Sequence, residues 1–399
     1  MRILVLCSKL PYPPKDGGAI ATGNLLKGLA SHGFEITLLS FNTRKHYFPP
    51  ENIPDEIKEQ ISIITVDADT SISLPGALRN LLFSRKPYVA QRFEHDSFRN
   101  QLTSLIKERI FDIIQLEGPY FESYLTEIRK YSKARVVVRA HNIEHEIWNR
   151  RWKQEKNPLR RMYLRNLSNR IQKLETDLLQ AIDALLPISE RDGLLFHELN
   201  PNLKQHVVPT GIDIDSYAAI NHDKIKDLFF IGALDWIPNQ EGLKWFIREI
   251  LPRLERSNPS LSIHIAGRNA LKDGRKLFRH SMIKFHGEVD DAKAYMQEHG
   301  IMLVPLFTGS GIRIKILEGM ALEKCIITTT VGAEGIPAEH GKHLFIANDP
   351  EVFHQTILKV LEDESLVRRI GSEAKKLVQE KFDTFAITSG LGEFYNKLA

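Results

Sequence analysis

Two successive series of apolar strands, each strand followed by a helical segment, constrain the fold of this chain more than any other feature. The start of the chain shows the repeating unit. It has an apolar strand at 2–7, a loop with prolines and glycines, a helix from about 19 to 32, and a strand at 35–41 directly after Gly33. Consecutive strand, helix and strand indicate a parallel sheet whose faces are covered by helices. We therefore expect an α/β protein.

The same pattern occurs in both halves of the chain and predicts two domains. A length of 399 residues allows two to three domains at about 150 residues each. We expect residues 1–205 to form the first domain, residues 206–382 the second, and residues 383–399 a terminal helix that the second sheet does not need. Strands are expected at 2–7, 35–41, 61–66, 112–116, 135–140, 184–188, 227–232, 261–266, 283–286, 300–304, 325–328 and 344–346. Helices are expected at 19–32, 95–109, 120–131, 159–180, from about 190 with Ser189 as its cap, and at 239–257, 290–298, 312–323, 350–362, 364–381 and 383–398.

The composition excludes several classes of protein. A hydrophobic content of 42% is too high for a disordered chain. The two cysteines, Cys7 and Cys325, cannot form a disulfide scaffold and indicate a reducing compartment. The apolar start of the chain breaks at Pro11, and about 18 consecutive apolar residues occur nowhere, so neither a secretory signal nor a transmembrane helix is expected. We expect a cytoplasmic location and no nucleic-acid partner.

Positive charge is concentrated in residues 148–173, which contain nine lysines and arginines and a single acid. This segment therefore carries +8, whereas the rest of the chain carries −4. Trp148, Trp152 and Leu159 lie among the basic residues. Such a segment is typical of peripheral contact with the inner face of an anionic membrane, here through Arg150–Lys173. The alternative is a solvated helix face whose apolar residues lie in the core.

Glycine-rich loops follow strands in both halves. Gly17 and Gly18 lie between the first strand and the first helix, where bare backbone and a helix N-terminus favour an anion. A second loop, 309–311, precedes the helix expected at 312–323. Arg313 and Lys315 place positive charge in its first turn, which opposes the helix dipole unless an anion is bound. The alternative for both loops is a plain turn before a solvated helix.

Two further strand ends carry polar candidates. His141 and His145 match a zinc-binding His-x-x-Glu-His spacing, but that chemistry needs both rings on one helix face. Because residues 135–140 indicate a strand, His141 is expected at the strand end, and a metal site is not expected. There His141 can hydrogen-bond a ligand or serve as a structural histidine. Arg268, after another strand, can hold a phosphate or lie in solvent.

Together these segments resemble the retaining glycosyltransferases of family 4, and the resemblance covers essentially the whole chain. The family implies the GT-B fold, in which two doubly wound Rossmann-like domains face each other across a cleft and a C-terminal helix crosses back to the first domain. The order and spacing of the matching segments make the resemblance specific. Those segments are Gly17-Gly18, Arg139–His145, Val208–Asp213, Phe230–Gly232, Ile265–Arg268, His286–Val289, Gly309–Ala321 and Val331–Ile336.

The resemblance implies a metal-independent hexosyltransferase that uses a nucleotide-sugar and needs no further cofactor. The first domain would hold a sugar or lipid-linked acceptor, and the second domain the donor. The reaction would retain configuration, in cell-surface polysaccharide or glycolipid synthesis. Glu318 matches the acid that binds the ribose hydroxyls. The expected catalytic residues are His141, Arg313 and Lys315, and the expected donor-binding residues are Gly17, Gly18, Gly232, Arg268, Ser310, Gly311, Ile312 and Glu318.

The sequence also departs from the family pattern. Ser310 stands where the family usually has a second acid, and Ala233 replaces the arginine of a basic pair whose lysine is also absent around Asn239. Arg313, Lys315 and Arg268 are the candidates to replace that charge, as in a branch of the family with a Gly-x-Gly-x-Arg-x-Lys-x-x-Glu loop. A sugar-nucleotide epimerase of similar architecture and a catalytically degenerate donor-binding protein are the alternatives.

Overall fold

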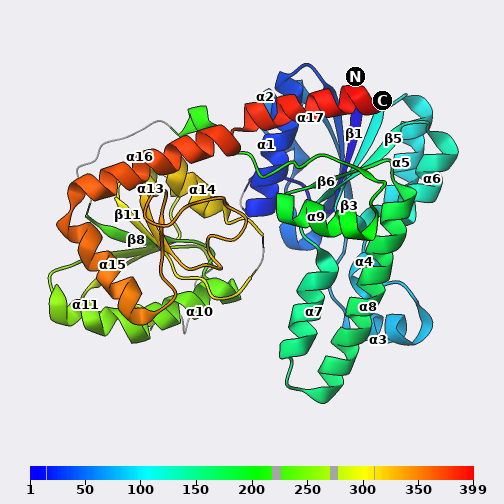
Figure 1. The fold of residues 1–399 in the computed structure, drawn as a ribbon. Coiled ribbons are helices and arrows are strands. Elements are labelled where there is room, and N and C mark those ends of the chain that lie inside the picture. The colour runs from blue at the N-terminus through cyan, green and yellow to red at the C-terminus, as the bar shows by residue number, and fades with distance from the viewer. Residues whose placement is uncertain (15, 218–225, 270–276, 310) are drawn as a thin grey trace. The chain divides into compact units, whose positions relative to one another are not determined.

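The chain folds into two compact units, each of which is an α/β domain. Met1–Gly211 and Phe385–Ala399 form the first, and Ile212–Thr384 forms the second. In the described part of the chain, no helix has the length and apolar content needed to cross a membrane. The computed structural model describes residues 1–14, 16–217, 226–269, 277–309 and 311–399 (Figure 1).

The first domain is built on a sheet of seven parallel strands in the order β3-β2-β1-β4-β5-β6-β7. The order reverses between β1 and β4, and ligands of doubly wound sheets bind at such a point, beyond the carboxyl ends of the strands. The strands are β1 (Arg2–Cys7), β2 (Glu35–Thr43), β3 (Ile61–Ala68), β4 (Ile113–Glu117), β5 (Arg135–Ala140), β6 (Ala184–Pro187) and β7 (Lys204–Gln205).

Apolar side chains cover both faces of this sheet. Leu4 and Leu6 of β1 belong to one core cluster, and Ile3 and Val5 belong to another. Successive side chains of a strand point to opposite faces, so a continuous apolar run is what a sheet buried on both sides requires. This explains why the strands were recognisable in the sequence.

Helices flank the first sheet, and four of them were not predicted: α2, α3, α4 and α7. The helix expected at 120–131 begins as a 3-10 turn at Pro119–Tyr124, because proline suits a helix start but not its interior. The helices are α1 (Gly17–Ser31), α2 (Asp55–Gln60), α3 (Leu74–Phe83), α4 (Tyr88–Gln91), α5 (Asp96–Glu108), α6 (Leu125–Tyr131), α7 (Glu144–Gln154), α8 (Pro158–Ala181), α9 (Glu190–Leu199) and α17 (Thr384–Leu398).

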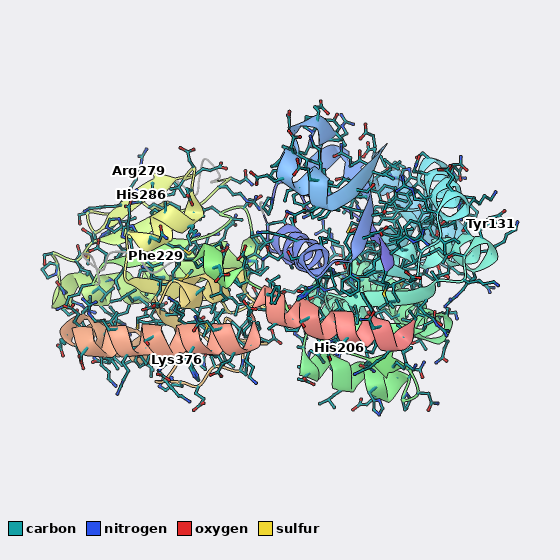
Figure 2. The ribbon with its side chains drawn as sticks, turned by 90° about the horizontal axis from the view of Figure 1, so that it is seen from above. Tyr131, His206, Phe229, Arg279, His286 and Lys376 are labelled. Carbon is teal, nitrogen blue, oxygen red and sulfur yellow. The ribbon has the colours of Figure 1, made fainter. Side chains whose placement is uncertain are left out.

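The C-terminal helix returns to the first domain, as the resemblance implied. Leu391 and Tyr395 of α17 join the core cluster that contains Leu25 of α1. Helices α17 and α1 lie side by side in both views (Figure 1, Figure 2). His206, labelled in Figure 2, stacks on Phe394 of α17 at a ring distance of 5.2 Å.

The second domain contains a six-stranded parallel sheet with the order β10-β9-β8-β11-β12-β13. Its order reverses between β8 and β11. The two parallel sheets confirm the predicted fold class. The strands are β8 (Leu228–Ile231), β9 (Ile263–Ala266), β10 (Ile283–Gly287), β11 (Ile301–Val304), β12 (Cys325–Thr328) and β13 (Phe345–Ile346).

Two helical segments of the second domain differ from the prediction. The helix expected at 239–257 contains a π-helical turn at Phe246–Ile250, just before Pro252, which has no N–H to continue the regular pattern. The helix expected at 312–323 begins only at Ile314. The helices are α10 (Ile237–Trp245), α11 (Leu251–Ser257), α13 (Ala292–Gln297), α14 (Ile314–Ala321), α15 (Pro350–Glu362) and α16 (Glu364–Lys381).

The domain borders follow from backbone pairing. The chain stays attached to the first sheet beyond residue 205, because the Val208 N–H donates to the Pro187 carbonyl at 2.8 Å. Where the chain passes between the domains, Ile212 forms a parallel bridge with Asp383. The division therefore lies at Gly211 and Thr384, a few residues after the expected ends at 205 and 382.

Candidate functional site

In the second domain, the predicted donor-binding loops meet at the switch point between β8 and β11. Gly232 follows β8, and Gly267 follows the neighbouring strand β9. A Cβ atom on Gly267 would lie 1.9 Å from the carbonyl oxygen of Gly232, so the two loops approach each other as closely as backbone allows. Residues 305–309 and 311–313, between β11 and α14, complete this edge.

Lys315, in the first turn of α14, contacts the end of β8. Its Nζ donates to Asn239 Oδ1 at 2.9 Å and to the Ile231 carbonyl at 3.3 Å, and it lies 4.3 Å from the centre of the Phe230 ring. A Cβ atom on Gly232 would come within 3.2 Å of Nζ. Burial, followed by the charge of Arg313, lowers the pKa of Lys315 to about 7.

Arg313 is the N-cap residue of α14, not part of its first turn as expected. Its side chain is buried, its Nη1 donates to the Gly311 carbonyl at 2.9 Å, and its guanidinium lies 5.7 Å from the Trp236 ring centre. Burial lowers the pKa of Arg313, and Glu334 acts in the opposite direction. The alternative of a solvated surface helix is therefore wrong for this segment.

The loop before α14 depends on glycine. Gly309 and Gly311 have φ values of +106° and +79°, which only glycine adopts readily. Ser310 lies outside the described residues. Ile312 packs against Gly335, where an added Cβ atom would lie 2.8 Å from Ile312 Cγ1. The 331–336 segment is thereby held against the loop.

Glu318 lies one turn further along α14 and is partly buried. The Tyr217 hydroxyl donates to its Oε1 at 3.0 Å. Burial raises the pKa of Glu318 to about 6, and the hydrogen bond from Tyr217 only partly opposes this effect. The Glu318 carboxylate is thus held on one side by a tyrosine near the start of the second domain.

Arg268 lies directly after Gly267 and is partly buried; its carbonyl accepts a hydrogen bond from the Leu234 N–H at 2.9 Å. Gly17 and Gly18 belong to the first domain and open α1. Asp16 caps this helix by accepting from the Ala19 N–H at 3.1 Å, and it also pairs with Lys9. The loop after β1 is therefore anchored by an ion pair.

In the first domain, His141 follows β5 and is held by Glu117, the last residue of β4. The distance from His141 Nε2 to Glu117 Oε2 is 2.7 Å. Burial alone would raise the pKa of Glu117, but Arg139, His141 and Gln115 outweigh it and lower the pKa to about 2. An ionised carboxylate only accepts hydrogen bonds, so Nε2 of His141 carries the proton and Nδ1 is the atom left to face a ligand.

Glu117 is the centre of a wider buried network. Arg139, fully buried, donates to its Oε2 at 3.4 Å, and the Thr22 hydroxyl of α1 donates to the same oxygen at 3.1 Å. Gln115 donates to the other oxygen and itself accepts a hydrogen bond from the Tyr395 hydroxyl of α17. A chain of hydrogen bonds therefore links the C-terminal helix to His141.

His141 and His145 do not lie on one face of the same helix. His141 precedes α7, whereas His145 lies within it and donates from Nδ1 to Glu175 Oε2 at 2.7 Å. Glu175 of α8 also accepts from the Glu144 and His145 N–H groups, so it caps α7. His145 is therefore tied to helix packing.

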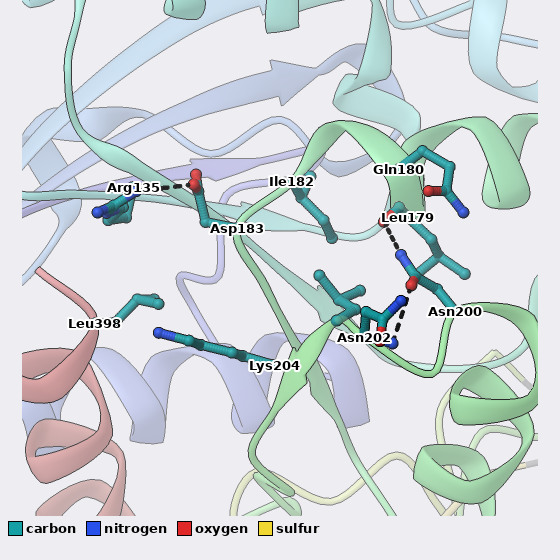
Figure 3. Close-up of a pocket in the computed structure, with 10 residues that line it drawn as sticks. Arg135, Leu179, Gln180, Ile182, Asp183, Asn200, Asn202, Lys204 and Leu398 are labelled. Carbon is teal, nitrogen blue, oxygen red and sulfur yellow. Dashed lines mark hydrogen bonds and ion pairs between the residues drawn. The ribbon is translucent and has the colours of Figure 1, made fainter.

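A cavity of about 400 Å³ lies at the opposite edge of the first sheet (Figure 3). It is bordered by the start of β5 at Arg135, by Asp183 and Lys204, and by Leu398 of α17. Arg135 pairs there with Asp183 at 3.3 Å. None of the predicted site residues lines this cavity, which opens at the amino ends of the strands.

Sequence reasoning missed Glu117, Tyr217 and Asn239 as site residues. Glu117 left a signal, because a carboxylate at the carboxyl end of an apolar strand is out of place unless it has a partner. Tyr217 and Asn239 left none, since each contacts its partner across many residues of sequence: Asn239 meets Lys315, and Tyr217 meets Glu318.

This architecture is that of the GT-B glycosyltransferases. Sucrose-phosphate synthase from Thermosynechococcus elongatus superposes with a TM-score of 0.70 at 16% identity and covers 100% of this chain and 99% of its own. Anabaena Alr3699/HepE in complex with UDP gives 0.68 at 13% identity, with full coverage of both chains. TarM, known from S. aureus, gives 0.70 at 10% identity and covers 99% and 98%.

The chain belongs to glycosyltransferase family 4. Residues 15–216, just over half of the chain, match the family model described as "Glycosyltransferase Family 4", and residues 225–363 match "Glycosyl transferases group 1". An uncharacterised 44.6 kDa protein in the cps region of Klebsiella pneumoniae is 23% identical over 98% of both chains. An uncharacterised glycosyltransferase of Methanocaldococcus jannaschii is 24% identical over 44% of this chain and 48% of its own.

Proposed function

We propose that this glycosyltransferase moves a hexose from a nucleoside-diphosphate sugar to an acceptor, with retention of configuration and without a catalytic metal. The observation that carries the proposal is the grouping of Arg313, Lys315 and Glu318 at the N-cap and within the first two turns of α14, at the switch point of the second sheet. A buried arginine and a partly buried lysine beside a helix N-terminus suit a diphosphate. A carboxylate one turn further suits a ribose diol.

The chemistry needs this charge. Breaking the anomeric C–O bond leaves negative charge on the departing diphosphate and cationic character on the sugar. Fixed cations in a buried environment stabilise the additional negative charge on the departing diphosphate. They stabilise the intact donor less, because that charge has not yet developed there. Asn239 orients the Lys315 ammonium at the end of β8. Lys315 would therefore supply the positive charge that the missing basic pair after β8 would otherwise provide. Arg313, Arg268 and the loop glycines would complete the diphosphate site.

On the acceptor side we assign His141 to the transferred sugar. The support is its position at the carboxyl end of β5 and its orientation by Glu117, which leaves Nδ1 for a ligand. Gly17 and Gly18 would face the diphosphate with backbone N–H groups at the start of α1. Glu117 and Arg139 act as positioning residues for this arrangement.

The comparisons suggest which donor and pathway to test first. HepE has been solved with UDP and with UDP-glucose, so uridine diphosphate sugars are the first donors to examine. The relative in the cps region of K. pneumoniae supports a role in cell-surface polysaccharide or glycolipid synthesis. Thermal shifts with UDP, GDP and ADP, followed by donor turnover with and without acceptor, test the proposal. Turnover that needs no acceptor would indicate an epimerase, and binding without turnover a donor-binding protein.

Replacing Glu318 by glutamine should weaken nucleoside-diphosphate binding about tenfold, because hydrogen bonds to a charged group contribute about 1.5–3 kcal/mol each. Calorimetric titration with UDP, or the nucleotide that the panel selects, measures this loss. The matching 2′,3′-dideoxynucleotide lacks the diol and should bind the variant and the wild type equally. Glu323→Gln, two residues after the end of α14, serves as the control. Equal UDP affinity for Glu318→Gln and wild type would remove Glu318 from the ribose site.

We also propose that the first domain rests on an anionic membrane that presents the acceptor. The basic segment forms two helices, α7 and α8, joined at Glu155–Asn157. Its tryptophans are partly buried and lie against basic side chains: Arg151 lies 5.3 Å from the Trp148 ring, and Arg161 lies 5.5 Å from the Trp152 ring. Exposed apolar side chains occur elsewhere on this surface.

Helix α3 supplies the stronger apolar face. Leu74, Leu78, Leu82 and Phe83 leave between 58% and 84% of their surface exposed, and the three leucines recur every four residues on one side of the helix. Arg170 of α8 donates to the Asn80 and Leu81 carbonyls of α3, and Figure 1 shows the two helices side by side. On α8, Leu159 and Met162 are also exposed among arginines.

Vesicle flotation tests this surface. The protein should bind anionic but not neutral vesicles, and salt should weaken the binding, since each basic residue near the membrane contributes about 1 kcal/mol. Leu78→Glu with Leu82→Glu, or Arg160, Arg161 and Arg165 all changed to Glu, should lower binding at least about tenfold. Ile110→Glu, an exposed apolar position outside this surface, is the matched control. Unchanged flotation of both multiple variants would contradict the proposal.

A further inference from the structure

A second polar cluster lies in the second domain at the opposite edge of the sheet from the proposed donor site. Asp227 directly precedes β8, His264 is the second residue of β9, and His299 lies two residues before β11. These three strands are neighbours in the order β9-β8-β11. Three side chains with metal-binding atoms are therefore brought together from three adjacent strands, at their amino ends.

The distances between these side chains match those around a small metal ion. His264 Nε2 lies 3.7 Å from Asp227 Oδ2, and His299 Nδ1 lies 3.5 Å from the same oxygen. One ligand atom from each of the three residues lies within 4.8 Å of the other two. In a tetrahedral zinc site, bonds near 2.0–2.1 Å place ligand atoms roughly 3.3 Å apart. The two distances to Asp227 need shifts of only a few tenths of an ångström, whereas the pair of imidazole nitrogens, within 4.8 Å of each other, needs a shift of at most about 1.5 Å.

The surroundings orient the imidazoles. His264 Nδ1 lies 3.0 Å from His286 Nε2, so the second ring nitrogen of His264 is engaged and Nε2 is the one that faces Asp227. His286 is the extra residue of an irregularity in β10, between Phe285 and Gly287, and such bulges redirect side chains. Figure 2 labels His286 together with Phe229, whose ring lies 5.6 Å from that of His299.

We propose that Asp227, His264 and His299 bind one divalent ion of the zinc class. Two imidazoles and one carboxylate suit zinc, cobalt or nickel, whereas magnesium and calcium prefer oxygen ligands. His264 and His299 are buried, and Asp227 leaves a third of its side chain exposed, so the ion enters from the Asp227 side with water as the fourth ligand. The ion ties three strand starts together and stabilises the domain. It takes no part in sugar transfer, because the site lies at the other end of the strands.

Metal binding is tested on the full chain after removal of metal with EDTA. One equivalent of Zn²⁺ should bind by calorimetry, Co²⁺ should give the visible absorption of a four- or five-coordinate site, and Mg²⁺ should give neither. Zn²⁺ at a hundredfold excess over its dissociation constant should raise the melting temperature of the second domain by roughly 5–10 °C.

Two variants separate this site from adventitious binding. Asp227→Asn, at the partly exposed ligand, and His299→Gln should each weaken Zn²⁺ binding about tenfold or more. Both variants should keep nucleoside-diphosphate binding, which reports a folded domain. His197→Gln, an exposed histidine on α9, should change nothing. Absence of stoichiometric Zn²⁺ binding in the wild type, or the same binding in Asp227→Asn, would overturn the proposal and leave a hydrogen-bonded polar cluster.

Discussion

Replacing Lys315 by methionine should lower sugar transfer and nucleoside-diphosphate affinity by at least about tenfold. The physical reason is the loss of a charge-assisted contact with the diphosphate, which contributes about 1.5–3 kcal/mol. The same variant should make the ligand-free domain more stable, on the order of 5 kcal/mol at pH 6, because a desolvated charge is removed. Steady-state kinetics, calorimetric titration and thermal unfolding measure the three effects.

The pH dependence of both effects follows from the pKa of Lys315, which burial lowers from 10.5 to about 7. Between pH 7 and 10.5 the unfolded chain holds the proton and the folded domain does not. Ligand-free wild type therefore gains stability as the pH rises through this window, and the advantage of the methionine variant shrinks. At pH 8, diphosphate binding should draw close to one proton onto Lys315, which titrations in buffers of different ionisation enthalpy detect.

Lys324 provides a matched control for Lys315. It is another buried lysine of the same domain, its pKa is lowered by burial to about 8, and its Nζ donates to the Gln297 carbonyl at 3.2 Å. Lys324→Met should change stability without changing nucleotide affinity or proton uptake. If Lys315→Met binds the nucleoside diphosphate as tightly as wild type does, the diphosphate assignment is wrong.

The second large effect is expected at Glu117. Glu117→Ala should destabilise the first domain by about 3–5 kcal/mol, because the fully buried Arg139 loses its carboxylate partner. His141 loses its orientation in the same variant, so transfer should fall as well. Calorimetric unfolding of the first domain measures the stability change. Changing Glu117 to Gln together with Arg139 to Met should recover much of the stability without restoring activity.

Acid unfolding gives a second view of Glu117. Its folded pKa of about 2 lies below the ordinary 4.5, so its contribution to stability is present above pH 4.5 and is lost as the pH falls toward 2. Glu117→Ala should lack this part of the dependence of stability on pH. Glu127→Ala, which breaks the more exposed Arg99–Glu127 pair, should cost no more than about 1 kcal/mol. If Glu117→Ala lowers the free energy of unfolding no more than Glu127→Ala does, the central role of the Glu117 carboxylate is contradicted.

The sequence alone was sufficient for the architecture. Uninterrupted apolar strands that alternate with helical segments predicted two parallel sheets, since a strand buried on both faces must be apolar at every position. Local rules also worked at single residues. Ser189 accepts from the Asp192 N–H as the cap of α9, and Gly33 takes a positive φ after α1.

Two helices that bury almost none of their side chains were not predicted. Helix α7 buries none of its residues completely, and α3 buries only Asn80, so neither shows an apolar stripe toward the core. Their helical state depends on contacts with other segments. Glu175 of α8 caps α7, and Arg170 of α8 binds carbonyls of α3. Such contacts between distant segments leave no local pattern.

The polar partners at the two candidate sites were decided by tertiary structure. Glu117 meets Arg139 because the two residues are register partners in β4 and β5, and Lys315 meets Asn239 because α14 begins where β8 ends. A sequence shows which side chains can carry charge, but not which charges share a buried space. Strand register and backbone approach determine that sharing. For Glu117, the neighbouring groups outweigh burial and lower the pKa to about 2, whereas burial lowers the pKa of Lys315 to about 7.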